Sequence, residues 1–411
     1  MRRKCTDSLI QWKKNPHRHP LLLQGLRQTG KTWLALDFAE KNYKNTLYLN
    51  LETDKPVADY LSVSRPPQDA LLFLETYAGK PLKPSVSLLI LDNIQCVPEL
   101  STLLTAISLD YPQYHIIAIH RGLASPELYS KNDFHIISLY PLDFEEFLWA
   151  NAEYALSREI RRHFSTLTPL GKELHQKALS QFYLYLVLGG MPLSVLEYRR
   201  EKKLLMVPDI QQKLLELILG DISSQAPTGM TRHCQNAWLS IPAQLEKSSR
   251  KFQYSLITKG ATAKTYEKPL DWLLRSGYAL ACRQTSLHLY PTDCGLCARV
   301  LGVPSYQLLT GSDTPAARAC TETFLAQHFT RNGYTLSYWS SGNRAEVPFL
   351  LEKEGQHIAV DYRLTPHQKT RNLTRFRAEM NTNAEMYLLS VEDFREKENY
   401  HIVPVYAGFC V

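Results

Sequence analysis

Apolar residues in the first 140 positions form short runs that alternate with longer helical patterns. Residues 32–43 (TWLALDFAEKNY) place Trp33, Leu34, Leu36 and Phe38 at helical spacing. Short segments that are apolar on both faces and separated by helices are typical of a parallel β-sheet with helices on each side. The runs that we predict as strands are residues 20–24 (PLLLQ), 45–53 (NTLYLNLET), 87–92 (SLLILD) and 113–120 (QYHIIAIH).

Helical patterns dominate after residue 140. We predict a helix, a stop at Gly277 and a two-stranded wing within residues 269–293. The last hundred residues alternate again, with a helix at 317–333 followed by mixed short strands and helices. The other helices predicted in this half are residues 141–164, 171–190, 211–222 and 236–248, and the short strands are 334–340, 345–355 and 357–364.

Composition sets broad limits on the class of protein. A chain of 411 residues suggests two to four domains, and 44% hydrophobic with 21% charged residues is ordinary for a globular protein. The net charge of +7 permits nucleic-acid binding without arguing for it. The basic start has no signal-peptide core, and no apolar run approaches the ~18 residues that span a bilayer. Eight cysteines are too sparse for a disulfide framework, so we expect a cytoplasmic protein with no membrane contact.

Residues 25–32, GLRQTGKT, fit the phosphate-loop pattern G-x-x-x-x-G-K-[ST] between an apolar strand and an amphipathic helix. The two glycines allow successive N–H groups to point at phosphates, and the helix that follows directs its N-terminal dipole at the anion. Lys31 adds positive charge and Thr32 offers a hydroxyl to Mg²⁺. We predict that ATP is bound by Gly25, Leu26, Arg27, Gln28, Thr29, Gly30, Lys31 and Thr32.

A carboxylate at the end of a neighbouring strand is the second element that such a site needs. Asp92 closes the run SLLIL about sixty residues after Lys31, with one strand–helix unit between them. At that place it would hold Mg²⁺ through its water shell. We therefore assign the metal to Thr32 and Asp92.

Together these segments resemble a large group of predicted bacterial and archaeal AAA-type ATPases with a C-terminal domain of unknown function. The resemblance is carried by GLRQTGKT, LYLNLE, LILDNIQCVPEL, LYPLDFEEFL, LGGMP, IPAQLEKSSRKFQYSLITKG and TDCGLCARVLG. It implies an α/β fold: a P-loop parallel sheet with a helical lid, a winged-helix segment and a small restriction-endonuclease-like domain. The implied boundaries are 1–148 for the ATP-binding domain, 149–205 for the lid, 206–304 for the winged-helix-like segment and 305–411 for the nuclease-like domain.

The ATPase-like part departs from the pattern of that group at two points. Asn93 stands where a glutamate usually follows the magnesium aspartate, and an amide accepts no proton. The turn after the next strand reads AIHRG in place of a Thr-Gly-Ser type, which leaves His120 or Arg121 to face the γ-phosphate. We expect hydrolysis to be weak or absent, with Asn93 and His120 as the candidate catalytic residues. The alternative is modest hydrolysis supported by an arginine from a neighbouring subunit.

The nuclease-like part departs further. In the group, a helix glutamate, a Glu-x-Asp strand and a Glu-x-Lys strand form the expected pattern. Glu322 matches the first, but Pro348 replaces the aspartate and cannot bind a metal, while Asp361 and Arg363 replace the last pair. Two acidic metal ligands and a lysine are needed for cleavage of this kind, so nuclease chemistry is not expected.

Basic segments leave nucleic-acid binding open. Residues 251–277 are consistent with a helix-turn-helix, and Lys259, Lys264 and Lys268 lie near the helix that would enter the major groove. Another basic cluster consists of Lys369, Arg371, Arg375 and Arg377. A solvated helical face or a protein interface is the alternative, and a net charge of only +7 favours it. Cys294 and Cys297 have the CxxC spacing, for which a metal site or two incidental thiols are the alternatives.

Three functions follow from these observations. The first is an ATP-binding AAA-type protein whose nucleotide state moves the winged-helix and C-terminal parts, together with an unidentified protein partner or a second copy. The second is a DNA-binding scaffold that uses ATP structurally. The third, a nuclease-ATPase of a defence system, conflicts with Pro348.

Overall fold

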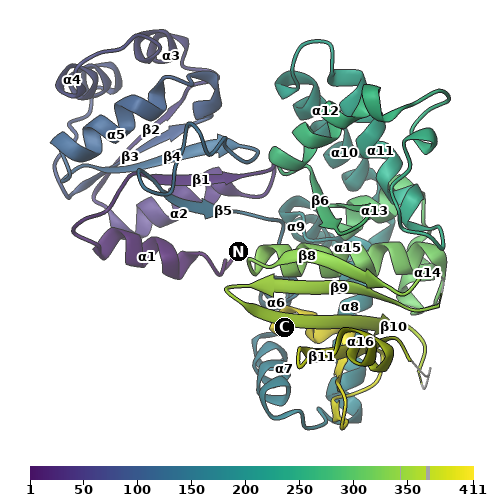
Figure 1. Ribbon diagram of the computed structural model, residues 1–411. Helices are drawn as coiled ribbons and strands as arrows, with labels where there is room; N and C mark the ends of the chain where they lie inside the picture. The colour runs from purple at the N-terminus through teal and green to yellow at the C-terminus, as the bar shows by residue number, and fades with distance from the viewer. Residues whose placement is uncertain (343, 367–370) are drawn as a thin grey trace. The chain divides into compact units, whose positions relative to one another are not determined.

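The computed structural model describes residues 1–342, 344–366 and 371–411, which form two compact units (Figure 1). Residues 2–140 with 275–277 make up the N-terminal unit. Met1, residues 141–274 and residues 278–411 make up the C-terminal unit. The division into four segments that the sequence suggests remains a proposal.

A five-stranded parallel sheet forms the centre of the N-terminal unit, with strand order β2-β3-β4-β1-β5. The predicted parallel α/β fold is therefore confirmed. The sequence analysis named α2 and the four other strands, but it did not predict the edge strand β5 or the helices α1, α3, α4 and α5. The strands are β1 Leu21–Gly25, β2 Asn45–Asn50, β3 Ser87–Asp92, β4 His115–Arg121 and β5 His135–Ser138; the helices are α1 Thr6–Lys14, α2 Lys31–Asn42, α3 Lys55–Leu61, α4 Pro67–Ala78 and α5 Leu100–Asp110.

Helices cover both faces of this sheet because its central strands are apolar on both sides (Figure 1). α1 and α2 pack on one face, where Ile117 and Ile119 of β4 point. α3, α4 and α5 pack on the other face, against Ile116 and Ala118. The alternation along β4 therefore assigns every second residue of the strand to the α2 side.

The carboxyl ends of the parallel strands meet at one edge of the sheet. The Cα pairing aligns Asn50 with Asp92, Asp92 with Ile119, and Gly25 with Arg121. Polar residues that are far apart in the chain are thereby collected beside the loop that follows β1. In open α/β sheets, ligands bind at this edge.

The C-terminal unit begins with helices and ends with a mixed sheet. The sheet order among the described residues is β12-β13-β11-β10-β9-β8, with parallel pairing of β10, β11 and β13 and antiparallel pairing elsewhere. Its strands are β8 Thr335–Ser340, β9 Glu346–Lys353, β10 Gln356–Arg363, β11 Glu385–Ser390, β12 Arg395–Glu396 and β13 His401–Pro404. The helices are α6 Phe144–Ala150, α7 Tyr154–Thr166, α8 Lys172–Leu188, α9 Pro192–Glu201, α10 Val207–Gln225, α11 Thr231–Leu245, α12 Ala263–Arg275, α13 Cys294–Leu301, α14 Ser305–Leu309, α15 Pro315–Arg331 and α16 Asn372–Met380.

Local patterns predicted most of these elements. The hairpin of β6 (Ala279–Arg283) and β7 (Leu287–Pro291) follows α12 where the sequence predicts a two-stranded wing. The predicted helix at 141–164 is instead two helices, because α6 ends at Ala150 and the chain turns through Ala152, which has φ 64°. The asparagine that follows Ala150 closes α6 by donating its backbone N–H to the carbonyls of the last turn.

In the part of the chain that the structure describes, we find no individual helix that has both the length and the apolar composition of a membrane span. α8 and α9 pass the test of length and composition only as a pair, and they are bent by 117°.

A glycine at the sheet edge gives a test of this packing. A Cβ on Gly25, which has φ +142°, would lie 2.2 Å from the backbone oxygen of Leu139, whereas a Cβ on Gly79, φ +60°, meets nothing within 4 Å. We expect Gly25→Ala to lower the free energy of unfolding by about 4 kcal/mol or more, and Gly79→Ala by about 1 kcal/mol. Urea denaturation measures both, and equal effects would contradict the contact with Leu139.

Candidate nucleotide site

The loop between β1 and α2 has the backbone of an anion-binding site. Gln28 and Gly30 adopt positive φ angles of 65° and 91°, and Gly30 is the N-cap of α2. A capping residue without a side chain leaves the first N–H groups of α2 open toward an anion. The predicted role of residues 25–32 is consistent with this geometry.

Buried hydrogen bonds hold the loop in shape. Thr29 has no exposed surface, and its hydroxyl donates to the Leu26 carbonyl at 2.9 Å. The guanidinium of Arg3 donates to the Thr29 carbonyl at 2.9 Å and to the Tyr140 carbonyl at 2.6 Å. No motif marks this role of Arg3 in the sequence, where the residue is part of an ordinary basic terminus.

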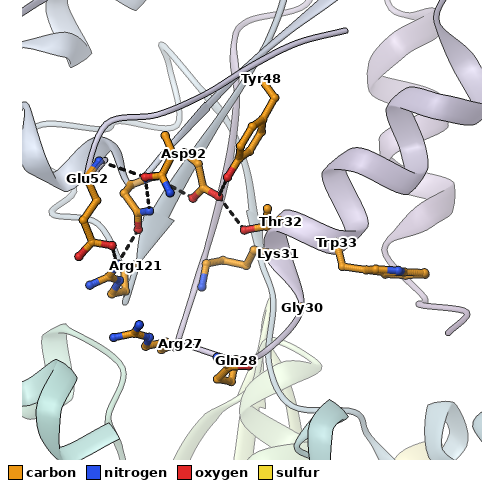
Figure 2. Close-up of a pocket in the computed structure, with 12 residues that line it drawn as sticks. Arg27, Gln28, Gly30, Lys31, Thr32, Trp33, Tyr48, Glu52, Asp92 and Arg121 are labelled. Atoms are coloured by element: carbon orange, nitrogen blue, oxygen red, sulfur yellow. Dashed lines mark hydrogen bonds and ion pairs between the residues drawn. The ribbon is translucent and has the colours of Figure 1, made fainter. Parts of the chain in front are cut away.

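Lys31, Thr32 and Asp92 converge at the carboxyl edge of the sheet (Figure 2). The Lys31 ammonium donates to the carbonyls of Gly25 and Leu26 at 2.6 and 2.7 Å. The Thr32 hydroxyl donates to Asp92 Oδ2 at 2.7 Å, and the Tyr48 hydroxyl donates to the same oxygen at 3.0 Å. A threonine hydroxyl and a carboxylate oxygen are hard oxygen ligands, the kind that Mg²⁺ binds.

A cavity of about 380 Å³ opens over these residues. Its size falls within the usual range for small-molecule sites. Trp33 lies at its margin, 48% exposed, with its ring directed away from Lys31 (Figure 2). The cavity is lined by Arg27, Gln28, Gly30, Lys31, Thr32, Trp33, Tyr48, Asn50, Glu52, Asp92, Asn93 and Arg121. The donor set and the cavity fit a nucleoside triphosphate with Mg²⁺.

Asn93 adopts the left-handed conformation, with φ 60° and ψ 45°, which asparagine tolerates better than glutamate does. Both the nitrogen and the oxygen of its amide group form hydrogen bonds. Nδ2 donates to Asn50 Oδ1 at 2.8 Å, while Oδ1 accepts from Arg121 at 3.0 Å and from Gln95 at 3.3 Å. The side chain is therefore held firmly beside Asp92, and it carries no base.

The structure separates the two residues considered for the γ-phosphate. Arg121 lines the cavity, pairs with Glu52 at 2.5 Å and is buried. His120 is outside the described lining; it contacts the Gly122 carbonyl at 3.2 Å and packs edge-on against Tyr129. Burial lowers the pKa of His120 to about 4, so its imidazole is neutral near pH 7. The geometry favours Arg121 over the predicted His120.

Three residues that the sequence analysis did not identify complete the lining of the site. Tyr48, Asn50 and Glu52 all come from β2 or the turn after it. They lie in the segment LYLNLE, residues 47–52. Their role depends on β2 pairing with β3, and the strand order cannot be read from the sequence.

The C-terminal unit gathers the acidic residues of the predicted nuclease-like pattern around an arginine. Arg250 forms an ion pair with Glu322, which is 1% exposed, and lies 3.3 Å from Glu346. Tyr362 donates its hydroxyl to Glu322 at 2.6 Å. These residues adjoin a polar cavity of about 260 Å³ whose lining also includes Pro348, Asp361 and Arg363.

Within the described residues, no group of three or more His, Cys, Asp or Glu side chains is arranged to hold a metal ion. Cys294 and Cys297 are buried near the start of α13. Of the basic residues singled out in the sequence, Lys259, Lys264 and Lys268 are exposed. Lys369 lies outside the described residues.

A P-loop NTPase fold with a phosphate loop and a magnesium-strand aspartate is the class that this geometry defines. Residues 17–148 match a protein family described as an AAA domain. Residues 179–307 match a domain of unknown function, DUF8612.

A comparison with solved structures found matches at low sequence identity. The Walker-type ATPase PABY2304 of Pyrococcus abyssi is 14% identical, with a TM-score of 0.47, over 73% of this chain and 95% of that one. The Aeropyrum pernix Orc1 protein in complex with DNA is 13% identical, with a TM-score of 0.30, over 74% and 92%. No curated protein matches the chain.

The Arg250 pair leads to a prediction about stability. Removing one partner of a buried ion pair leaves a buried charge, so Arg250→Met should lower the free energy of unfolding by about 3–5 kcal/mol. Adding Glu322→Gln should restore part of that loss, because the buried charge is then removed. Arg162→Met, which breaks an exposed pair with Glu159, should cost less than about 1 kcal/mol. Urea denaturation of the wild type and the three variants measures these free energies of unfolding. A decrease in Arg250→Met no greater than that in Arg162→Met would refute the stabilising role of the pair.

Proposed function

We propose that the chain is an ATP-binding AAA-type protein whose hydrolysis is weak or absent. The observation that carries the proposal is the convergence of Lys31, Thr32 and Asp92 beneath a cavity of triphosphate size. Lys31 and the loop amides would bind the phosphates, and Thr32 and Asp92 would hold Mg²⁺ and its water. Bound Mg²⁺ would neutralise phosphate charge.

Weak hydrolysis follows from Asn93. General-base catalysis is worth roughly 10²–10⁴ in rate, and an amide cannot supply it. The hydrogen bonds of Asn93 to Asn50, Arg121 and Gln95 further restrict its freedom to orient a water. Modest hydrolysis with a residue supplied by a partner is the alternative.

The remaining parts of the proposal concern the rest of the chain. Nucleotide state would be coupled to the winged-helix-like segment and the C-terminal domain, within the four segments that the sequence suggests. The protein would act in the cytoplasm with a protein partner or a second copy of itself. The match of residues 179–307 to a domain of unknown function leaves the partner's chemistry open.

Nucleotide binding should depend on the phosphate loop. We expect Lys31→Ala to weaken the binding of Mg²⁺–ATP, measured by calorimetry, by at least about tenfold, because a charge-assisted contact is lost. Lys41→Ala is a matched control, since Lys41 lies on the same helix and pairs with Asp37. Wild-type protein that gives neither heat nor a thermal shift with millimolar Mg²⁺–ATP would refute the proposal.

Hydrolysis should depend on the residue at position 93. We expect wild-type phosphate release close to background and a rise of at least about tenfold in Asn93→Glu, which gains a carboxylate of the usual length. Asn93→Asp, with a shorter carboxylate, should give a smaller rise. Rapid release by wild type that does not change in Asn93→Glu would contradict an impaired site.

DNA binding is a second candidate, supported by one arrangement in the C-terminal unit. Lys268 and Arg283 line a groove of about 560 Å³ between α12 and the β6–β7 hairpin, together with Glu267 and Asp271. A helix beside a β-hairpin is a common way to present basic residues to a DNA groove. The two acidic residues weaken the electrostatic case for it.

Salt dependence tests this second candidate. If α12 contacts DNA, retention should fall steeply with salt, and Lys264→Gln with Lys268→Gln should reduce the logarithmic slope by about one unit per lost phosphate contact. The pair Lys202→Gln and Lys203→Gln in another part of the unit serves as control. No retention at low salt would remove this candidate.

A further inference from the structure

Arg121 is shared between two side chains, Glu52 in the turn after β2 and Asn93 directly after β3. Its Nη2 lies 2.5 Å from Glu52 Oε2 and 3.0 Å from Asn93 Oδ1. The Arg121 side chain is 9% exposed, whereas that of Glu52 is 45% exposed. The guanidinium is therefore held within the protein, whereas its carboxylate partner is about half exposed to solvent.

The position of Arg121 in the sheet brings it to the phosphate loop. β4 lies between β3, which ends at Asp92, and β1, which leads into the loop. Arg121 is the Cα partner of Gly25, the first residue of that loop, and lies two residues beyond Ile119, the partner of Asp92. Because side chains alternate along a strand, Arg121 points to the same face as Asp92 and α2.

We propose that Glu52 competes with the terminal phosphate of a bound nucleotide for Arg121, and that this competition sets the preference of the site between triphosphate and diphosphate. The inference rests on the proposed nucleotide binding and adds a regulatory residue to it. Glu52 and Asp92 are the carboxylates in the described lining of the cavity, and Asp92 is already bound by Thr32 and Tyr48.

Replacing Glu52 by a phosphate as the partner of Arg121 affects the two residues differently. A buried guanidinium needs an anionic or polar partner at all times, and its planar donors suit a phosphate as well as a carboxylate. Glu52 loses little on release, because a half-exposed carboxylate is readily hydrated. Asn93 keeps its hydrogen bond to Arg121 in either state and so holds the guanidinium at the cavity.

Glu52 is ionised at neutral pH in the paired state. The hydrogen bond from Arg121 lowers the pKa of its carboxyl, with smaller contributions from Arg27 and Lys55. A charged competitor is therefore present whenever the protein works near neutrality. Replacing it with an uncharged isostere removes the competition without removing the side chain.

Affinities for Mg²⁺–ATP and Mg²⁺–ADP, measured by calorimetry, test the proposal. Arg121→Gln should weaken ATP binding by about tenfold to a hundredfold and change ADP binding by less than about twofold. Glu52→Gln should tighten ATP binding by about two- to fivefold and leave ADP binding unchanged. In the double variant the effect of Glu52→Gln should vanish, because the two residues act through one another.

Opposite changes in ATP affinity in Arg121→Gln and Glu52→Gln distinguish competition from a purely structural ion pair. If Glu52→Gln weakens ATP binding as Arg121→Gln does, or if both nucleotides respond equally, Glu52 is a structural partner and the proposal is wrong. Arg121→Lys keeps the charge and should retain part of the ATP preference; Arg65→Gln, at an exposed cation over Tyr60, is the control. If the wild-type protein binds neither Mg²⁺–ATP nor Mg²⁺–ADP, the proposed function itself is overturned. Lys31→Ala shows what the absence of nucleotide binding looks like in the same assay.

Discussion

The hydrogen bond between Thr32 and Asp92 joins two segments sixty residues apart, and the rest of the site depends on it. It forms because β1 and β3 end at the same edge of a parallel sheet, with β4 between them. That strand order also brings Arg121 to the gap and leaves Asn50 opposite Asp92. A different order of the same strands would preserve every local motif and lose the site.

Charge balance explains why Asn93 is compatible with this arrangement. A glutamate at position 93 would place a third carboxylate beside Asp92 and Glu52, with Arg121 and Lys31 as the cations near them. Asparagine fits the left-handed backbone there and accepts from Arg121 without adding charge. The guanidinium then keeps Glu52 as its ionic partner. The acid that is absent at position 93, directly after β3, is thus accompanied by an acid, Glu52, in the turn after the neighbouring strand β2.

Local sequence was sufficient for many of the helices and strands and for half of the site. The phosphate loop and Asp92 follow from motifs of fixed spacing, and the strand runs follow from apolar segments with both faces buried. Because these strands are apolar on both faces, their sequences do not indicate to which face of the sheet each side chain points. His120 and Arg121 differ by one residue, so they point to opposite faces, and nothing in the run QYHIIAIH marks which face carries α2. Arg3 and Glu52 act through tertiary contacts that no spacing records.

The acidic cluster of the C-terminal unit follows the same rule of pairing, with a different consequence. Arg250 precedes Glu322 by 72 residues, so no local pattern connects them. A guanidinium fixed among Glu322, Glu346 and Tyr362 supplies the positive charge that a divalent ion would bring to these acids. With Pro348 in place of a ligand, the cluster is chemically suited to holding the fold together. A guanidinium, unlike a bound metal ion, cannot coordinate a water and lower its pKa so that the water attacks a phosphodiester.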